Sequence, residues 1–141
     1  MKYLSLSRLR IGVHTGDPAF RFQEGNWPAL KHLDLSGCDL QDDFVVQLTS
    51  GQWPLLQKLN LSQNLLGLQG VSQLVAGQWP NLVLLDLQYN DFDHIVAYSY
   101  DSSVIEEYKS FVKSIKVKWP AVQLRITQDY MTDWTIKQLS L

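Results

Sequence analysis

The residues that could do acid–base or nucleophilic chemistry are few in this sequence. His32 and Asp34 lie two residues apart, so on a strand both would face the same way as the hydroxyl of Ser36. Hydrolysis by such a triad also needs a pocket that excludes water and holds an oxyanion, which an open sheet does not offer. Asp93 and His94 are adjacent, and adjacent side chains point in different directions. We therefore expect no catalytic residue and no enzymatic activity.

Carboxylates that could bind a metal ion occur in two short clusters. Asp39, Asp42 and Asp43 form the first, and Asp91 and Asp93 form the second. Neither cluster has the glycine-punctuated spacing of a calcium-binding loop. Acidic side chains in the first turn of a helix stabilise its N-terminus, and we expect these residues to do so. The sequence also has no glycine-rich phosphate loop, so it predicts no metal and no cofactor.

The single cysteine, Cys38, has no second cysteine or histidine at zinc-ligand spacing, so we expect its thiol to be buried and inert. One cysteine forms no disulfide within the chain, which fits a reducing compartment. The first residues lack the apolar core of a secretory signal, and no apolar run approaches the roughly 18 residues of a membrane span. These features predict a cytoplasmic protein without membrane contact. The 12 basic and 14 acidic residues form no basic run, which argues against a nucleic-acid partner.

An internal repeat defines the elements that would position these side chains. The pair Trp-Pro begins at residues 27, 53, 79 and 119, and each of the first three pairs follows a glycine and a polar amide. After each of these three pairs the chain follows the pattern L-x-x-L-x-L-x-x-N/C-x-L, over residues 30–40, 56–66 and 82–92, with Phe92 at the last apolar position of the third copy. Three consecutive copies in one register, 26 residues apart, are typical of a solenoid built from stacked repeats.

The pattern also predicts the local structure of each copy. The alternating leucines indicate a short strand with one buried face, and stacked copies would form a parallel sheet. An asparagine or cysteine at the following turn can bond backbone groups that the turn leaves unpaired. Residues 42–48 and 70–75 are expected to be short helices that end at Gly51 and Gly77. Each Trp-Pro pair would then turn the chain back, with the indole covering the seam between repeats.

These motifs resemble the leucine-rich repeat family, and the strand-plus-helix copies are most similar to its ribonuclease-inhibitor-like class. The resemblance covers residues 1–128 and is strongest between Trp27 and Phe92. It implies an α/β solenoid, a short curved horseshoe of about five repeats with a parallel sheet on the concave side and short helices on the convex side. It further implies that the concave sheet binds proteins. The 26-residue period is short for that class, so the convex helices are expected to be single-turn or partly 3₁₀.

We expect residues 1–141 to form one leucine-rich repeat domain in three parts. Residues 1–28 would be a degenerate first repeat, residues 29–93 the regular repeats, and residues 94–141 a long helix, a last strand and a C-terminal cap. The helix is expected over residues 103–117, with an N-terminal capping box from Asp101 to Glu106. The first strand would leave one edge of the sheet open. Either an upstream segment of a longer protein or a second copy of this chain would cover that edge.

The strand positions that point away from the leucines define the candidate binding site. They combine aromatic, polar and charged side chains, as protein interfaces do. The predicted partner-binding residues of the concave face are Tyr3, His32, Asp34, Lys58, Asn60, Leu84, Asp86, Gln88, Tyr89 and Arg125. The sequence thus predicts a non-catalytic protein–protein interaction module that uses the concave sheet and an adjoining loop over residues 91–102. The alternative is a structural repeat segment of a larger protein, with no partner of its own.

A second group of aromatic residues lies where the chain leaves the repeat pattern. Tyr98, Tyr100 and Tyr108 occur close to His94 in this stretch. Loops that depart from a regular scaffold often carry function. The simpler interpretation is that these rings pack the longer loop onto its own helix, and both interpretations stay open at the level of sequence.

Overall fold

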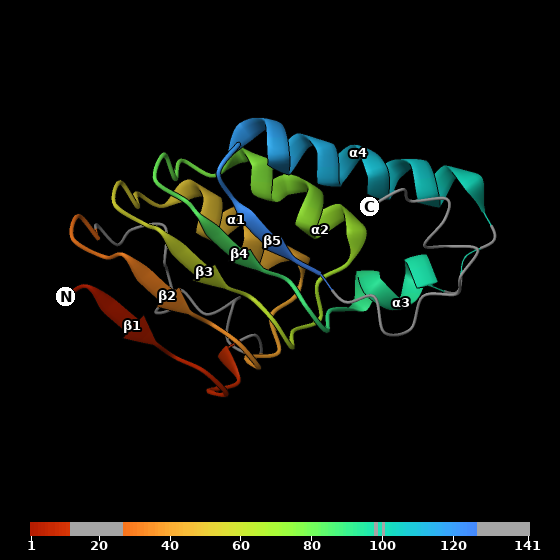
Figure 1. Ribbon diagram of the computed structural model, residues 1–141. Helices are drawn as coiled ribbons and strands as arrows, with labels where there is room; N and C mark the ends of the chain where they lie inside the picture. Colours follow the sequence, from red (N-terminus) through yellow and green to blue (C-terminus); the bar gives the residue numbers. More distant parts are fainter. Residues whose placement is uncertain (12–26, 98, 100, 127–141) are drawn as a thin grey trace.

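The computed structural model describes residues 1–11, 27–97, 99 and 101–126, and their strands form one parallel sheet. Each strand pairs with the next along the chain, in the order β1-β2-β3-β4-β5. The strands are β1 (Tyr3–Ser5), β2 (His32–Asp34), β3 (Lys58–Asn60), β4 (Leu84–Asp86) and β5 (Gln123–Arg125). In Figure 1 the helices lie against one face of this sheet and leave the other face open. This arrangement confirms the predicted α/β leucine-rich repeat solenoid.

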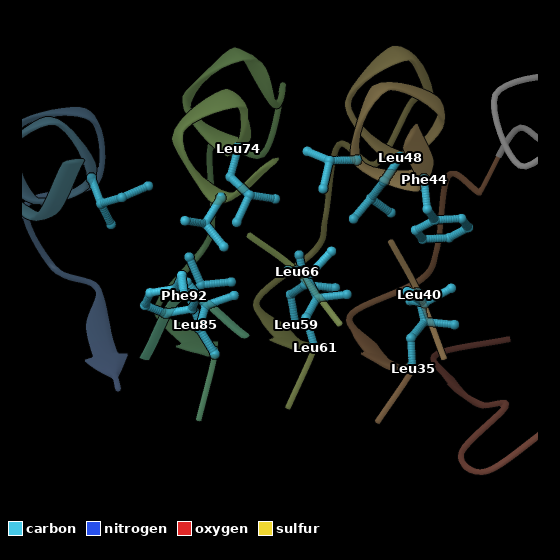
Figure 2. Close-up of a cluster of buried hydrophobic side chains, with 14 of the residues drawn as sticks. Leu35, Leu40, Phe44, Leu48, Leu59, Leu61, Leu66, Leu74, Leu85 and Phe92 are labelled. Atoms are coloured by element: carbon cyan, nitrogen blue, oxygen red, sulfur yellow. The ribbon is translucent and has the colours of Figure 1, made fainter. Parts of the chain in front are cut away.

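A column of leucines holds the strands to the helices. Leu33, Leu59 and Leu85 stand at the middle of their strands, in register with one another, and are at most 1% exposed. Figure 2 shows leucines of the strands and leucines of the helices, such as Leu48 and Leu74, pointing toward one another. Because burying one leucine stabilises a protein by about 1.5–3 kcal/mol, the repeated leucines account for the cohesion of the stack.

Asparagine side chains organise the turn after the second and third regular strands, as predicted. Asn64 is 4% exposed, and its Oδ1 accepts hydrogen bonds from the backbone N–H groups of Cys38 (2.9 Å) and Leu40 (3.0 Å). Its Nδ2 donates to the carbonyl of Leu35 at 3.0 Å. Asn90 occupies the same position one repeat later, and its Oδ1 accepts from the N–H of Leu66 at 3.1 Å. Each asparagine therefore joins its own turn to the preceding repeat.

The convex helices begin and end close to where the sequence predicts them. They are α1 (Asp42–Ser50), and α2 (Leu68–Ser72) with the 3₁₀ helix η3 (Gln73–Ala76) that continues it. The 3₁₀ segment confirms the expectation from the short repeat period for the second helix, whereas α1 is a nine-residue α-helix and does not follow it. Gly51 follows α1 and Gly77 follows η3, but both have negative φ angles, −77° and −63°. Their role is therefore not the left-handed helix ending that favours glycine.

Close packing of the tryptophans explains these glycines instead. A Cβ on Gly51 would lie 2.6 Å from Nε1 of Trp53, and one on Gly77 would lie 2.7 Å from the ring of Trp79. The indole of Trp53 also donates a hydrogen bond to the carbonyl of Leu48 at 3.0 Å, a carbonyl that accepts from the N–H of Gly51 as well, so the ring is held at the end of α1. The glycine two residues before the Trp thus makes room for the ring.

Tryptophans of neighbouring repeats stack on each other, as expected for residues that cover the seams. Trp27 and Trp53 are parallel, with ring centroids 5.7 Å apart. Trp79 and Trp119 are stacked at 5.5 Å, although 40 residues separate them in the sequence. The last Trp-Pro pair therefore occupies the same place in the stack as the first three, despite the longer insertion before it.

The insertion contains two helices, α3 (Asp91–Ala97) and α4 (Ser102–Lys118). α4 agrees with the predicted helix, and Asp101 caps it by accepting from the N–H of Ser103 at 2.9 Å. The predicted capping box is wrong in its second half, because Glu106 pairs with Lys109 at 3.4 Å. The predicted loop over residues 91–102 is also wrong, since its first half is α3.

Buried side chains four residues apart explain why α3 forms. Phe92 and Val96 lie on one side of this helix and are both fully buried. Asp93 lies three residues after Asn90, and its Oδ2 accepts from the N–H of Asn90 at 3.3 Å, as in a capping box. Phe92 contacts the ring of Tyr108 on α4 at 6.0 Å between centroids. The repeat pattern places Phe92 at its last apolar position, so the sequence did not predict the helix that begins at Asp91.

Several predicted features lie outside the described residues. These are the C-terminal cap over residues 127–141, the side chain of His94, and Tyr98 and Tyr100 of the aromatic group. The cover of the first strand is likewise untested, because residues 12–26 are outside the described ranges. Within those ranges, no helix has the length and apolar character needed to cross a membrane.

Candidate functional site: the concave face of the sheet

Two rows of side chains project from the open side of the sheet, and we call them together the concave face. The pairing register places one residue of each strand in each row. The first row is Tyr3, His32, Lys58, Leu84 and Gln123. The second row is Ser5, Asp34, Asn60, Asp86 and Arg125. These are the rows that the repeat pattern predicts, because alternate residues of a strand face opposite ways.

The concave face is hollowed over its central strands. A depression of about 190 Å³ brings together eight of the ten predicted site residues. They are Tyr3, His32, Asp34, Lys58, Asn60, Leu84, Asp86 and Arg125. Gln88 and Tyr89 follow β4 and do not line the depression. Pockets for small molecules measure about 300–1,000 Å³, so this depression is suited to a few side chains of a partner.

The second row has a structural role that sequence reasoning missed. In three successive repeats the side-chain Oδ1 of an Asp or Asn accepts a hydrogen bond from the backbone N–H two residues later. The acceptors are Asp34 (3.0 Å), Asn60 (3.0 Å) and Asp86 (3.1 Å). Such bonds fix the turn that leaves each strand. The signal in the sequence is the recurrence of Asp or Asn at the third residue of every regular strand.

The remaining carboxylate oxygens of this row also have partners. Oδ2 of Asp34 accepts from the hydroxyl of Ser5 at 3.5 Å. Oδ2 of Asp86 lies 4.0 Å from the guanidinium of Arg125, in an ion pair between β4 and β5. Asp34 and Asp86 are therefore in contact with the fold through both oxygens, which holds their side chains in place.

The first row is freer to meet a partner. Tyr3 is 57% exposed and meets the ring of His32 edge-on, with centroids 6.1 Å apart. Lys58 is exposed, and among the described residues its ammonium has no hydrogen bond and no ion pair. Leu84 is half-buried beside it. This row thus presents an aromatic pair, a free cation and an aliphatic side chain in that order across the sheet.

Tyr89 belongs to a third line of residues, at the turn after each strand. Arg8, Gly37, Gln63 and Tyr89 all have φ angles between 57° and 64°. Only one of the four is a glycine, although this backbone region costs other residues about 1–2 kcal/mol. Backbone hydrogen bonds between successive turns, such as Gly37 N–H to the carbonyl of Ser62 at 3.0 Å, hold the conformation. Tyr89 is 44% exposed at the border of the concave face.

The structure does not assemble the acid–base arrangement considered for His32. Among the described residues no hydrogen bond joins His32 to Asp34, and Asp34 instead accepts from the backbone of Ser36. Cys38 is buried as predicted, and its thiol donates to the carbonyl of Leu6 at 3.0 Å. Burial raises the pKa of the Cys38 thiol above its ordinary value, which keeps the sulfur protonated.

The clustered acidic residues lie at or just before the starts of helices, and two of them also join neighbouring repeats. Asp39 forms an ion pair with Arg10 at 3.4 Å, and Oδ1 of Asp42 accepts from the N–H of Gly67 at 2.7 Å. Both contacts bridge two repeats, and Asp42 and Asp43 also lie in the first turn of α1, as predicted. In the second cluster, Asp93 accepts from the backbone N–H of Asn90 just before α3. In the part of the chain that the structure describes, no group of three acidic, His or Cys side chains could hold a metal ion.

Comparison with known proteins agrees with this architecture. A family model described as Leucine Rich repeat matches residues 28–43, which contain the first regular ladder. The fold is similar to a solved structure of the leiomodin-1 actin-binding site 2, with a TM-score of 0.59 and 11% sequence identity. That similarity covers 99% of this chain and 77% of the other, and at such low identity it shows the fold alone. A search of curated proteins found no match. The ribonuclease-inhibitor-like class stays a prediction, whereas the repeated sequence and the family match over residues 28–43 support a leucine-rich repeat protein.

Proposed function

We propose that this chain is a protein-interaction module that binds a protein partner through its concave face. The depression over the central strands carries this proposal, because eight outward side chains from all five strands converge on it. Five adjacent strands span only about 20 Å, so the contact would be compact. Gln88 and Tyr89 would then contribute at its border, and α3 takes the place of the loop expected there.

The first row would supply most of the binding free energy. Tyr3 and His32 offer ring surface, and exposed aromatic residues are common at the centres of protein interfaces. Asp34 and Asp86 would act mainly by keeping the turns in place, since their oxygens are engaged within the fold. Binding would accordingly be more sensitive to Tyr3, His32 and Lys58 than to the carboxylates.

Affinity capture from the native cell extract, followed by mass spectrometry, tests this function. The concave variant combines Tyr3→Ala, His32→Ala and Lys58→Ala, and leaves the turn-forming aspartates unchanged. We expect the parent to retain a partner that this variant loses while keeping its circular dichroism spectrum. Partners that bind both proteins equally would contradict binding through the concave face.

A matched control separates this face from the rest of the surface. Glu107→Ala, Lys113→Ala and Lys116→Ala together remove three exposed charges from α4 on the convex side. We expect this control to retain the same partner as the parent. Actin should be included as one purified protein, because the structure with the shared fold is an actin-binding site.

The second candidate function is a structural segment of a larger repeat protein. The turn-forming bonds of Asp34, Asn60 and Asp86 favour it, because they explain the second row without any partner. It predicts that capture with the parent and with the concave variant gives identical results. The single-domain division and the cytoplasmic location stay predictions of the sequence under either function.

A further inference from the structure

We propose that the concave face recognises an acidic segment of its protein partner, with an Asp or Glu carboxylate bound to Lys58. This inference rests on the proposed function and adds the chemistry of the partner. The segment would be extended and would carry an aromatic or aliphatic residue within two or three positions of the acidic one. Lys58 supplies the charge that selects the segment, and the neighbouring side chains of the first row supply the apolar contact.

Lys58 stands at the centre of the face. It begins β3, the middle strand of the five, and the register places it between His32 on β2 and Leu84 on β4. It lines the depression and is exposed. A partner that enters the depression therefore meets this ammonium group.

The carboxylates around Lys58 already have hydrogen-bond or ion-pair partners other than Lys58. Asp34 is bound to the backbone of Ser36 and to the hydroxyl of Ser5, and Asp86 is paired with Arg125. Among the described residues, Lys58 is the one charged side chain of the depression with neither a hydrogen bond nor an ion pair. A carboxylate from the partner would give Lys58 a direct ion pair, whereas a basic segment would meet an unpaired cation.

Apolar surface flanks the ammonium on both sides. Neighbouring strands lie about 4.8 Å apart, so Leu84 and His32 each lie one strand from Lys58 and Tyr3 lies two strands away, about 10 Å. An extended chain advances about 3.3 Å per residue, so two or three residues of a crossing segment span this distance. Tyr3 is more than half exposed, and its ring is available to an apolar side chain of the partner.

A library of random linear peptides displayed on phage, selected on the full chain, tests the proposal. We expect selected peptides to share an Asp or Glu at one fixed position, with an aromatic or aliphatic residue nearby. The affinity of the protein for a synthesised peptide should fall about tenfold in Lys58→Gln. It should fall by the same factor when the shared Asp or Glu of the peptide is replaced by Asn or Gln. Lys113→Gln on the exposed side of α4 is the matched control and should bind like the parent.

Charge reversal adds a result that loss of folding cannot imitate. Lys58→Glu should reject the acidic peptide and bind its counterpart in which Lys replaces the acidic residue. A different outcome is that the selected peptides share no acidic position and still fail to bind the Tyr3, His32 and Lys58 triple variant. That result would overturn this inference and support the concave face as a binding site. Peptides that bind the triple variant as well as the parent would contradict the proposed function, and a selection that yields no binder would overturn the acidic-segment proposal.

Discussion

Replacing Asn64 by alanine should destabilise the fold more than any other single polar substitution at the turns. The side chain of Asn64 is the hydrogen-bond acceptor for the backbone N–H groups of Cys38 and Leu40, and all three residues are at most 4% exposed. Leaving a buried donor without an acceptor costs about 1–3 kcal/mol. Two such donors give an expected loss of about 2–6 kcal/mol in the free energy of unfolding. That is a large part of the about 5–15 kcal/mol typical of a domain.

Asn90→Ala provides the matched control for this prediction. Asn90 holds the equivalent position, but its Oδ1 accepts from a single backbone N–H, that of Leu66. Its loss should therefore be about 1–3 kcal/mol, roughly half that of Asn64→Ala. Urea denaturation followed by both circular dichroism and tryptophan fluorescence measures the two values. An Asn64→Ala protein that is no less stable than Asn90→Ala would refute the argument that the number of backbone N–H groups left without an acceptor sets the loss of stability.

Three further predictions follow from single contacts. Gly51→Ala should lower the free energy of unfolding by about 1–3 kcal/mol and shift the tryptophan emission, because the new Cβ would press on the ring of Trp53. An unchanged emission spectrum and stability would contradict this packing. Asp42→Ala should lower the free energy of unfolding by about 1 kcal/mol through loss of the hydrogen bond from Gly67. An unaltered midpoint of urea denaturation would show that this contact adds no stability. Tyr108→Phe should be neutral or stabilising at neutral pH, since the buried hydroxyl has no hydrogen-bond partner among the described residues. Burial raises the pKa of Tyr108, so the parent should lose stability as the pH rises above about 10, where the unfolded chain ionises, and this loss should shrink in Tyr108→Phe.

The sequence predicts the architecture well because the leucine pattern repeats without a gap. Leu33, Leu59 and Leu85 recur at one position in each copy, so the strand register follows from the spacing alone. The roles of Asn64 and Asn90 are predictable for a similar reason. A turn that recurs at the same place leaves the same backbone groups to be satisfied.

Features that depend on contacts between distant residues are harder to predict. The position of Gly51 was expected, but its physical reason is the ring of Trp53 and not the backbone conformation. The bond from Gly67 to Asp42 spans two repeats, and nothing in the local sequence indicates it. The short helix α3 could have been anticipated from Phe92 and Val96, which are four residues apart.

The candidate site was predicted in part. The outward positions followed from strand alternation, and the depression gathers eight of them. The sequence could not show that Asp34 and Asp86 have partners on both oxygens while Lys58 has none among the described residues, because this depends on side-chain geometry. That difference is the basis for the proposed preference for an acidic partner.

Photo-crosslinking from defined positions tests most directly whether the concave face binds a protein. A benzoylphenylalanine at position 123 would lie in the first row beside Leu84, and one at position 117 would lie on α4, where Val117 is 70% exposed. Irradiation in the native extract should join a protein to position 123 and not to position 117, and the Tyr3, His32 and Lys58 triple substitution should abolish that product. A crosslink only from position 117, or one from position 123 that persists in the triple variant, would contradict binding through the concave face.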